Sequence, residues 1–151
     1  MHSLRKIISG GQTGVDRAAL DVAKSLNIQE GGWCPNGRRA EDGEISSEYS
    51  LKETDSSDYP ERTRLNIEDA DATLILYLNV LEGGTRYTFQ YARDINKPIK
   101  LIDLNQTRDV NLVSDWLIQE DIKILNIAGP RASKCPEIYQ TAYDFLIQAL
   151  R

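Results

Sequence analysis

The sequence predicts an α/β protein with a Rossmann-like, three-layer α/β/α fold: a mainly parallel sheet of about five or more strands with helices on both faces. Strand and helix patterns alternate from one end of the 151-residue chain to the other. The apolar strand segments are short and do not alternate with polar residues, which is typical of parallel strands buried on both faces. Three of these strands end in a glycine-bearing turn that leads into a helix, a common arrangement in ligand-binding α/β proteins.

Length and composition favour one domain of ordinary character, and we expect residues 1–151 to form a single ligand-binding domain. Lys and Arg number 18 against 23 Asp and Glu, a net charge of −5, which argues against a nucleic-acid polymer as partner. One histidine, His2, and two distant cysteines, Cys34 and Cys135, predict no metal site and no disulfide framework. Because no segment resembles a membrane span or a signal peptide, we expect a cytoplasmic protein without membrane contact.

The first half of the chain is predicted to contain two strands, one helix and a long polar excursion. Residues Ile7–Ser9 form a short apolar strand, and a helix begins at Thr13, with Asp16 closing a capping box three residues later. One face of this helix is an apolar stripe of Val15, Ala18, Ala19, Val22, Ala23 and Leu26. Gly31–Pro35 is the second strand, which the proline terminates. Residues 36–58 are polar and lack periodicity, and a loop of this length in a compact domain is typical of a binding loop or lid.

The second half continues the alternation. Asp58 and Glu61 form a second capping box, which predicts a helix ending at about Asp69. Residues 72–78 are the strongest strand, and Thr85 is expected to cap the helix that follows it. The remaining elements are a strand at 99–104, a helix with Val110, Val113 and Leu117 on its inner face, a strand at 123–128, and a last helix whose inner face carries Ile138, Ala142, Phe145, Leu146 and Ala149.

Three glycine-bearing turns are expected to meet at one edge, because the carboxyl ends of parallel strands point the same way. The first, Gly10–Gly14, offers backbone amides and a helix dipole that favour phosphate; the alternative is that its glycines serve only a tight strand-to-helix turn. It is neither a Walker A loop nor a Gly-x-Gly-x-x-Gly sequence, and Asp16 is expected to cap the helix rather than contact a ligand. The second turn, Gly83–Thr85, repeats the design, and the third, starting at Gly129, adds Arg131.

Several arginines follow these turns or begin the polar excursion, so positive potential is expected at this edge of an acidic protein. Arginine holds oxyanions through two parallel hydrogen bonds, which predicts an anionic small ligand. The alternative is that many of these arginines pair with neighbouring acids on the surface. Cys34 and Cys135 are interpreted as structural thiols.

Long ordered motifs run through this sequence: Ile7–Asp21 (IISGGQTGVDRAALD), Gly31–Pro35 (GGWCP) with Gly37–Gly43 (GRRAEDG), Glu61–Thr63 with Asn66, Asp71–Ile75, and Gly83–Thr85. These motifs resemble those of the molybdenum-cofactor carrier proteins, and the resemblance covers essentially the whole chain. That family belongs to a wider Rossmann-like superfamily, which also contains the lysine-decarboxylase-like nucleoside-monophosphate phosphoribohydrolases.

The resemblance implies that the chain carries molybdenum cofactor, a pterin dithiolene with a phosphate and an oxo-anionic metal centre; another phosphorylated heterocycle is the alternative. Residues Gly11–Gly14 would hold phosphate, Gly83–Thr85 would approach the other end, and Arg38 or Arg39 would close over the ligand. It also implies molybdoenzyme apoproteins as partners and a homo-oligomer. The expected binding residues are Gly10, Gly11, Gln12, Thr13, Gly14, Arg17, Pro35, Arg38, Arg39, Arg62, Gly83, Gly84, Thr85 and Arg131, with no catalytic residue and no metal ligand.

The rival hypothesis is an enzyme that hydrolyses the N-glycosidic bond of a nucleotide. The related phosphoribohydrolases carry Pro-Gly-Gly-x-Gly-Thr-x-x-Glu, whose glutamate takes part in catalysis. Matching Gly84-Thr85 to that motif puts Thr88 at the position of the glutamate, which predicts binding without turnover. Asp16, Glu41 or Asp42 could in principle replace the missing carboxylate. A nucleotide-sensing module is a third hypothesis with the same fold and no turnover.

Overall fold

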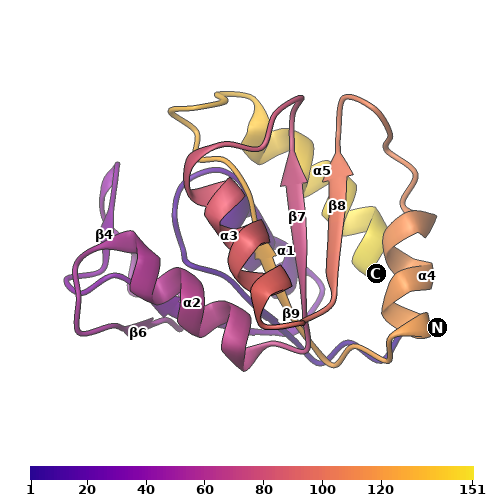
Figure 1. The fold of residues 1–151 in the computed structure, drawn as a ribbon, viewed down its shortest axis with the longest axis horizontal. Coiled ribbons are helices and arrows are strands. Elements are labelled where there is room, and N and C mark those ends of the chain that lie inside the picture. The colour runs from indigo at the N-terminus through magenta and orange to yellow at the C-terminus, as the bar shows by residue number, and fades with distance from the viewer.

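A five-stranded parallel sheet forms the centre of the computed structural model, which describes residues 1–151 (Figure 1). The strand order is β2-β1-β9-β7-β8, and every neighbouring pair is parallel. This sheet confirms the predicted fold class. The strands are β1 (Lys6–Ile8), β2 (Gln29–Gly31), β7 (Ala72–Tyr77), β8 (Ile99–Asp103) and β9 (Ile124–Ala128).

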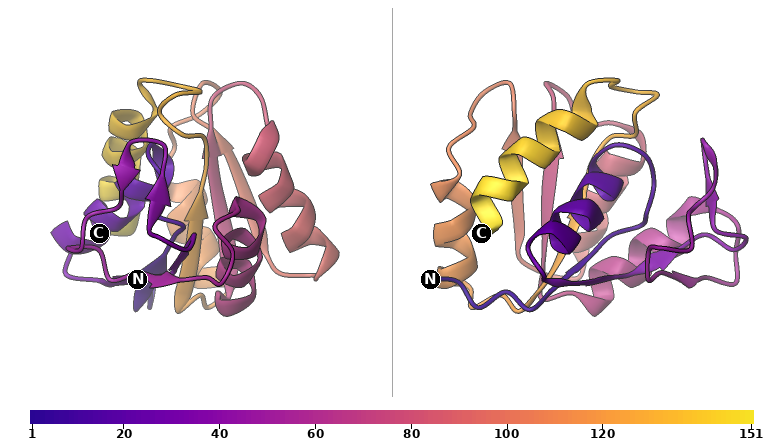
Figure 2. Two further views of the ribbon diagram at one scale, coloured as in Figure 1. Left: turned by 90° about the vertical axis from the view of Figure 1, so that its left-hand side faces the viewer. Right: turned by 180° about the vertical axis from the view of Figure 1, so that it is seen from behind.

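Five helices cover the two faces of the sheet and complete the three layers (Figure 2). Helix α5 packs against α1 and α4 on one face, and α2 packs against α3 on the other. None of the five is both long and apolar enough to cross a membrane. The helices are α1 (Val15–Ser25), α2 (Tyr59–Asp69), α3 (Gly83–Asp94), α4 (Asn111–Gln119) and α5 (Ile138–Leu150).

The main core lies between the sheet and the face formed by α1, α4 and α5. The predicted apolar stripe of α1 is buried there from Val15 to Ala23, and its last member, Leu26, is partly buried against the same core. Leu74 and Leu76 of β7 are also buried there. Because strand side chains alternate, Thr73 of β7 faces the opposite side, where its hydroxyl accepts a hydrogen bond from Asn126 Nδ2 at 3.3 Å. The side of the sheet under α2 and α3 is therefore the more polar one.

The predicted second strand, Gly31–Pro35, is divided in the structure. Strand β2 ends at Gly31, and β3 (Trp33–Cys34) pairs with β6 (Lys52–Glu53) outside the main sheet. The break lies at Gly32, which has a φ of +124°. A Cβ at this position would lie 2.3 Å from the Ser9 carbonyl oxygen, so the close approach of β1 requires glycine.

The predicted capping box of α1 is wrong. The helix begins after Gly14, and the Thr13 side chain caps no backbone amide in its first turn. The Asp16 carboxylate instead reaches backwards and accepts a hydrogen bond from the Gln12 amide at 3.3 Å. Tertiary contacts of Thr13 and Asp16 thus replace the local pattern that the sequence suggests.

The caps of α2 and α3 also differ from prediction, although the helices themselves are confirmed. The Glu61 carboxylate accepts a hydrogen bond from the Ser56 amide at 2.8 Å, so it anchors the preceding loop instead of closing a capping box. Helix α3 begins at Gly83, which places Thr85 inside its first turn rather than at its cap.

The polar excursion, residues 36–58, contains three short strands: β6, which pairs with β3, and β4 (Arg39–Ala40) and β5 (Gly43–Glu44), which form an antiparallel hairpin. It lies against the outer side of α1, where Leu20, Cys34, Ile45 and Tyr49 form a small second core. The Tyr49 hydroxyl donates a hydrogen bond to Asp21 Oδ1 of α1 at 2.6 Å. The base of the excursion is therefore packed against the rest of the chain.

Candidate functional site

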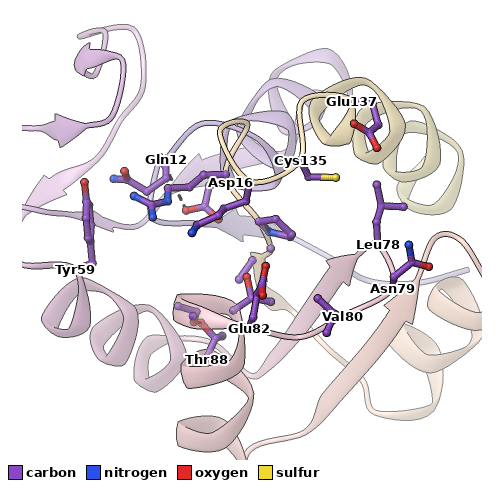
Figure 3. A pocket seen from close by; sticks show the side chains of 18 of the residues that line it. Gln12, Asp16, Tyr59, Leu78, Asn79, Val80, Glu82, Thr88, Cys135 and Glu137 are labelled. Atoms are coloured by element: carbon purple, nitrogen blue, oxygen red, sulfur yellow. Dashed lines mark hydrogen bonds between the residues drawn. The ribbon is translucent and has the colours of Figure 1, made fainter.

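A cavity of about 740 Å³ lies beyond the carboxyl ends of the parallel strands (Figure 3). Its walls come from residues that follow β1, β7, β8 and β9, together with the first turn of α2. Tyr59, Gln12 and Asp16 lie toward one end, and Asn79 and Glu137 lie toward the other (Figure 3). The volume is within the range of pockets that take nucleotide-sized ligands, and its position is where open parallel sheets bind them.

Three arginine side chains surround the ring of Tyr59. The guanidinium carbons of Arg39, Arg62 and Arg131 lie 5.1, 5.6 and 5.4 Å from the ring centroid, within cation–π distance. They come from the excursion, from α2 and from the loop between β9 and α5, so the fold brings together positive charge from distant parts of the sequence. We call Tyr59, Arg39, Arg62 and Arg131 the arginine cluster.

Asp16 is a buried carboxylate beside the arginine cluster. Its Oδ2 atom lies 3.4 Å from Arg62 Nη1, and the two side chains are 4% and 14% exposed. Burial raises the pKa of Asp16 and lowers the pKa of Arg62, while their mutual attraction opposes both shifts. The prediction that Asp16 caps the helix is wrong, because no side chain caps the start of α1; Asp16 lines the cavity instead. One carboxylate against three guanidinium groups leaves the cluster net positive.

The turn before α3 is open toward the cavity. Gly83, Gly84 and Thr85 line it, and a Cβ built on either glycine would meet nothing within 4 Å. The first backbone hydrogen bond of the helix is donated by Arg86 to Glu82, so the amides of Gly83, Gly84 and Thr85 have no acceptor in the protein. These amides and the N-terminal helix dipole form a positive surface for an anionic group.

The first glycine turn, in contrast, is closed by the protein itself. A Cβ on Gly10 would lie 2.2 Å from Arg62 Nη1, and one on Gly11 would lie 2.5 Å from Leu51 Cδ1. A Cβ on Gly14 would lie 2.3 Å from the Pro130 carbonyl oxygen. The sequence predicts that these glycines admit a ligand, but the structure shows that they admit other parts of the chain. Of residues 10–14, only Gln12 lines the cavity.

Other predicted binding residues serve the surroundings of the cavity. Arg38 donates hydrogen bonds to four backbone carbonyls of the excursion, which fixes that segment from within. Arg17 forms an ion pair with Asp42 at 2.7 Å and donates two hydrogen bonds to the Gly11 carbonyl. Pro35 is buried next to β3. Arg38, Arg17 and Pro35 do not line the cavity.

Thr13 belongs to a hydrogen-bonded clasp that joins three segments. Its hydroxyl donates to Glu41 of the β4–β5 hairpin and accepts from the Ala132 amide at 3.1 Å. Glu41 also accepts hydrogen bonds from the amide and the hydroxyl of Ser133. These bonds lower the pKa of Glu41, and they tie the hairpin that carries Arg39 to the loop that carries Arg131.

The position of the hydrolase glutamate is occupied by a hydroxyl with an internal partner. Thr88 lines the cavity and donates a hydrogen bond to the Gly84 carbonyl at 2.9 Å. Of the three carboxylates considered as substitutes, Asp16 lines the cavity, whereas Glu41 and Asp42 do not. No group of three or more His, Cys, Asp or Glu side chains is arranged to hold a metal ion.

Sequence reasoning missed Tyr59 and the far end of the cavity, where Asn79, Asn105 and Glu137 contribute polar groups. For Tyr59 a signal existed, because this aromatic residue begins α2 three positions before Arg62. Asn79 has a φ of +69° in the turn that follows β7. No pattern in the neighbouring residues predicts this turn or the place of Asn79 in the cavity.

Comparison with known proteins agrees with the fold and the motifs. The circularly permutated YpsA SLOG family (cpYpsA) matches residues 7–150. A crystal structure described as "Putative molybdenum carrier protein" from Syntrophus aciditrophicus SB is 45% identical, with a TM-score of 0.95. The match covers 99% of this chain and 97% of that chain, which confirms the resemblance that the motifs predict. No match is found among curated proteins. The chain belongs to the circularly permutated YpsA SLOG family.

Proposed function

We propose that this chain binds a phosphorylated, anionic small molecule of the molybdenum-cofactor type at the carboxyl edge of its sheet and carries it without turnover. The observation that carries the proposal is the convergence of Arg62, Arg131 and the open turn before α3 on one cavity. The 45% identical structure is described as a molybdenum carrier, which supports this ligand class.

The charges of the cavity suit such a ligand. Arg131 and Lys134 of the β9–α5 loop line the same cavity as Gly83 and Gly84, whose amides have no acceptor in the protein. A phosphate between them would accept charge-assisted hydrogen bonds, which are roughly twice as strong as neutral ones. A heterocycle would then extend toward Leu78 and Asn79 at the other end of the cavity, giving the ligand an anionic end and a flat end.

Carriage rather than hydrolysis is supported by Thr88, whose hydroxyl cannot replace a catalytic carboxylate. One observation favours the hydrolase alternative: Asp16 is a carboxylate with a raised pKa in the same cavity. Its Oδ2 atom accepts hydrogen bonds from Arg62 and the Gln12 amide. This arrangement is consistent with a structural role for Asp16 as well as a catalytic one. In the carrier we propose, molybdoenzyme apoproteins receive the ligand, and the cofactor is cargo.

Ligand binding to wild-type protein tests the proposal directly. We expect mass spectrometry under native conditions to detect a co-purified phosphorylated heterocycle, and molybdenum cofactor to raise the melting temperature by mass action. Arg131→Ala should weaken this ligand by about 10- to 100-fold, because a hydrogen bond to a charged group contributes about 1.5–3 kcal/mol. Isothermal titration calorimetry gives both affinities.

Arg5→Ala is the matched control, since Arg5 is an exposed arginine that precedes β1, at the opposite edge of the sheet. It should bind the ligand as wild type does. Equal affinities for the wild-type and Arg131→Ala proteins would contradict the proposed site. Release of free base from a nucleoside monophosphate, abolished by Asp16→Asn, would replace the carrier proposal with the hydrolase.

A further inference from the structure

The end of the cavity away from the arginine cluster is formed by two turns that one carboxylate holds together. Asp103 is the last residue of β8, and its Oδ1 atom accepts hydrogen bonds from the backbone amides of Asn79 and Asn105, each at 3.0 Å. Both asparagines line the cavity. Because the two amides meet at one oxygen, the turns after β7 and β8 are neighbours on the cavity wall.

Asn79 occupies a backbone conformation that L-residues seldom adopt. The Val80 amide donates a hydrogen bond to the Leu78 carbonyl at 2.9 Å, which closes a γ-turn around Asn79 with its φ of +69°. Strained positions of this kind cluster at ligand sites. The γ-turn and the bonds to Asp103 use backbone groups, so the side-chain amides of Asn79 and Asn105 are left available to a ligand.

Apolar side chains stand on both sides of Asn79. Leu78 packs against the main core, whereas Val80 is 54% exposed, and both line the cavity. Figure 3 shows Leu78, Asn79 and Val80 together at this end. Such a wall offers an apolar surface to the face of a flat ring and side-chain amides to its edge.

Glu137 is the charged residue that lies toward the same end as Asn79 (Figure 3). A carboxylate accepts two parallel N–H donors and donates none at neutral pH, whereas a side-chain amide does both. It also repels phosphate, which therefore favours the arginine cluster at the other end. The ring edge that suits these groups presents adjacent N–H donors together with a carbonyl oxygen.

This requirement separates two classes of heterocycle. The aminopyrimidinone edge, which pterin and guanine share, has two adjacent N–H donors and one carbonyl. The carboxylate can accept from the donors while an asparagine donates to the carbonyl. Adenine instead sets an unprotonated ring nitrogen beside its amino group, so a lone pair would face the carboxylate and a polar group would stay unsatisfied.

We propose that the far end of the cavity reads the edge of the heterocycle through Asn79, Asn105 and Glu137, and selects an aminopyrimidinone over an adenine-type ring. Asp103 is the positioning residue of this site, since it holds both asparagine turns. The inference rests on the proposed function and deepens it, because it names the ring that accompanies the phosphate.

Three nucleotides that share phosphate and ribose test the inference: GMP, IMP, which lacks the amino group, and AMP. We expect calorimetry on the wild-type protein to give the affinity order GMP, IMP, AMP, with GMP at least about 10-fold tighter than AMP. Glu137→Gln should bring the ratio of GMP to IMP affinity close to one, because the paired acceptor for the two N–H groups is lost.

Asp103→Ala tests the positioning role. It should lower the ratio of GMP to AMP affinity several-fold, because the two asparagines lose their common support, an effect that a general loss of stability would not produce. Asp109→Ala is the matched control: Asp109 lies in the same loop and accepts a hydrogen bond from the Asn111 amide, but it does not line the cavity. It should keep the wild-type ratio.

Equal wild-type affinities for GMP and AMP, or no measurable GMP binding, would overturn the inference, and this comparison needs no variant to fold. An unchanged ratio in a folded Glu137→Gln or Asp103→Ala protein would remove that residue from the site. The proposed function fails separately, if molybdenum cofactor does not bind in an Arg131-dependent way.

Discussion

Two glycine turns at the same sheet edge have similar sequences and opposite environments. The turn after β1 has the sequence Gly10-Gly11-Gln12-Thr13, and the turn after β7 has Gly83-Gly84-Thr85. In the first, protein atoms lie within 2.5 Å of the Cβ positions of both glycines, and the threonine hydroxyl is bonded to Glu41. In the second, the glycines face open space and their amides have no acceptor in the protein.

The difference shows that a glycine-rich turn before a helix has two distinct uses. The first turn allows other parts of the protein to approach: the Asp16 carboxylate accepts a hydrogen bond from the Gln12 amide, and the Pro130 carbonyl accepts one from the Val15 amide. The anionic group at this turn is therefore the Asp16 carboxylate of the protein itself. The second turn leaves its amides available to a ligand. We call them the closed turn, residues 10–14, and the open turn, residues 82–85.

The largest expected effect is on stability, from a side chain added to the closed turn. Gly14 has a φ of +84°, and its Cβ would lie 2.3 Å from the Pro130 oxygen. Backbone strain of about 1–3 kcal/mol and the collision with backbone atoms act together, so Gly14→Ala should lose at least about 3 kcal/mol of unfolding free energy. Urea denaturation followed by circular dichroism measures the loss.

Gly37→Ala separates the two causes. Gly37 has a similar φ of +81° but nothing within 4 Å of its Cβ position, so only backbone strain lowers the unfolding free energy of this variant. We expect it to lose about 1 kcal/mol. If Gly14→Ala were no less stable than Gly37→Ala, the contact with Pro130 would not be what requires glycine in the closed turn.

The next effect is on binding, from the same substitution in the open turn. Gly84 has no positive φ and open space around its Cβ position, so Gly84→Ala should keep or slightly raise stability, by up to about 1 kcal/mol. A methyl group on the cavity wall should nevertheless weaken molybdenum cofactor by about 10-fold, because it hinders close approach to the amides. A titration of Gly84→Ala that matches wild type would show that the ligand does not touch the open turn.

The sequence predicts the fold well because the signals that carry it are local. The stripe on α1, the apolar strand β7 and the last helix with Phe145 are all read from spacing and confirmed. The edge of the sheet at which the cavity lies follows from parallel topology alone. These features depend on periodicity and chain direction, which a sequence displays directly.

The closed turn could not be recognised from its sequence, because what fills it comes from distant segments. Arg62 and Leu51 reach Gly10 and Gly11 from more than 35 positions away in the chain. The role of Arg38 depends likewise on where the excursion places its own carbonyls. The local sequence predicts that these turns require glycine. Only the tertiary packing determines whether a ligand or another part of the protein approaches the glycine backbone.

The smallest expected effect comes from loosening the clasp that closes the first turn from outside. Hydrogen bonds from Ser133 and Thr13 lower the pKa of Glu41 below its usual 4.5, so the ionised form stabilises the fold above that pH. This contribution is lost as the pH falls through the lowered pKa, where the folded protein takes up the proton. Because Glu41 is exposed and solvent screens it, Glu41→Gln should lose less than about 1 kcal/mol at neutral pH.

Urea denaturation at a series of pH values checks both the size and the sign. The gap between the wild-type protein and Glu41→Gln should be greatest at neutral pH and should close as the solution is acidified below 4.5. Glu44→Gln, on the exposed strand β5 of the same hairpin, is the matched control and should show no such gap. A gap that widens in acid would mean that the Glu41 carboxylate does not hold the closed turn in its ionised form.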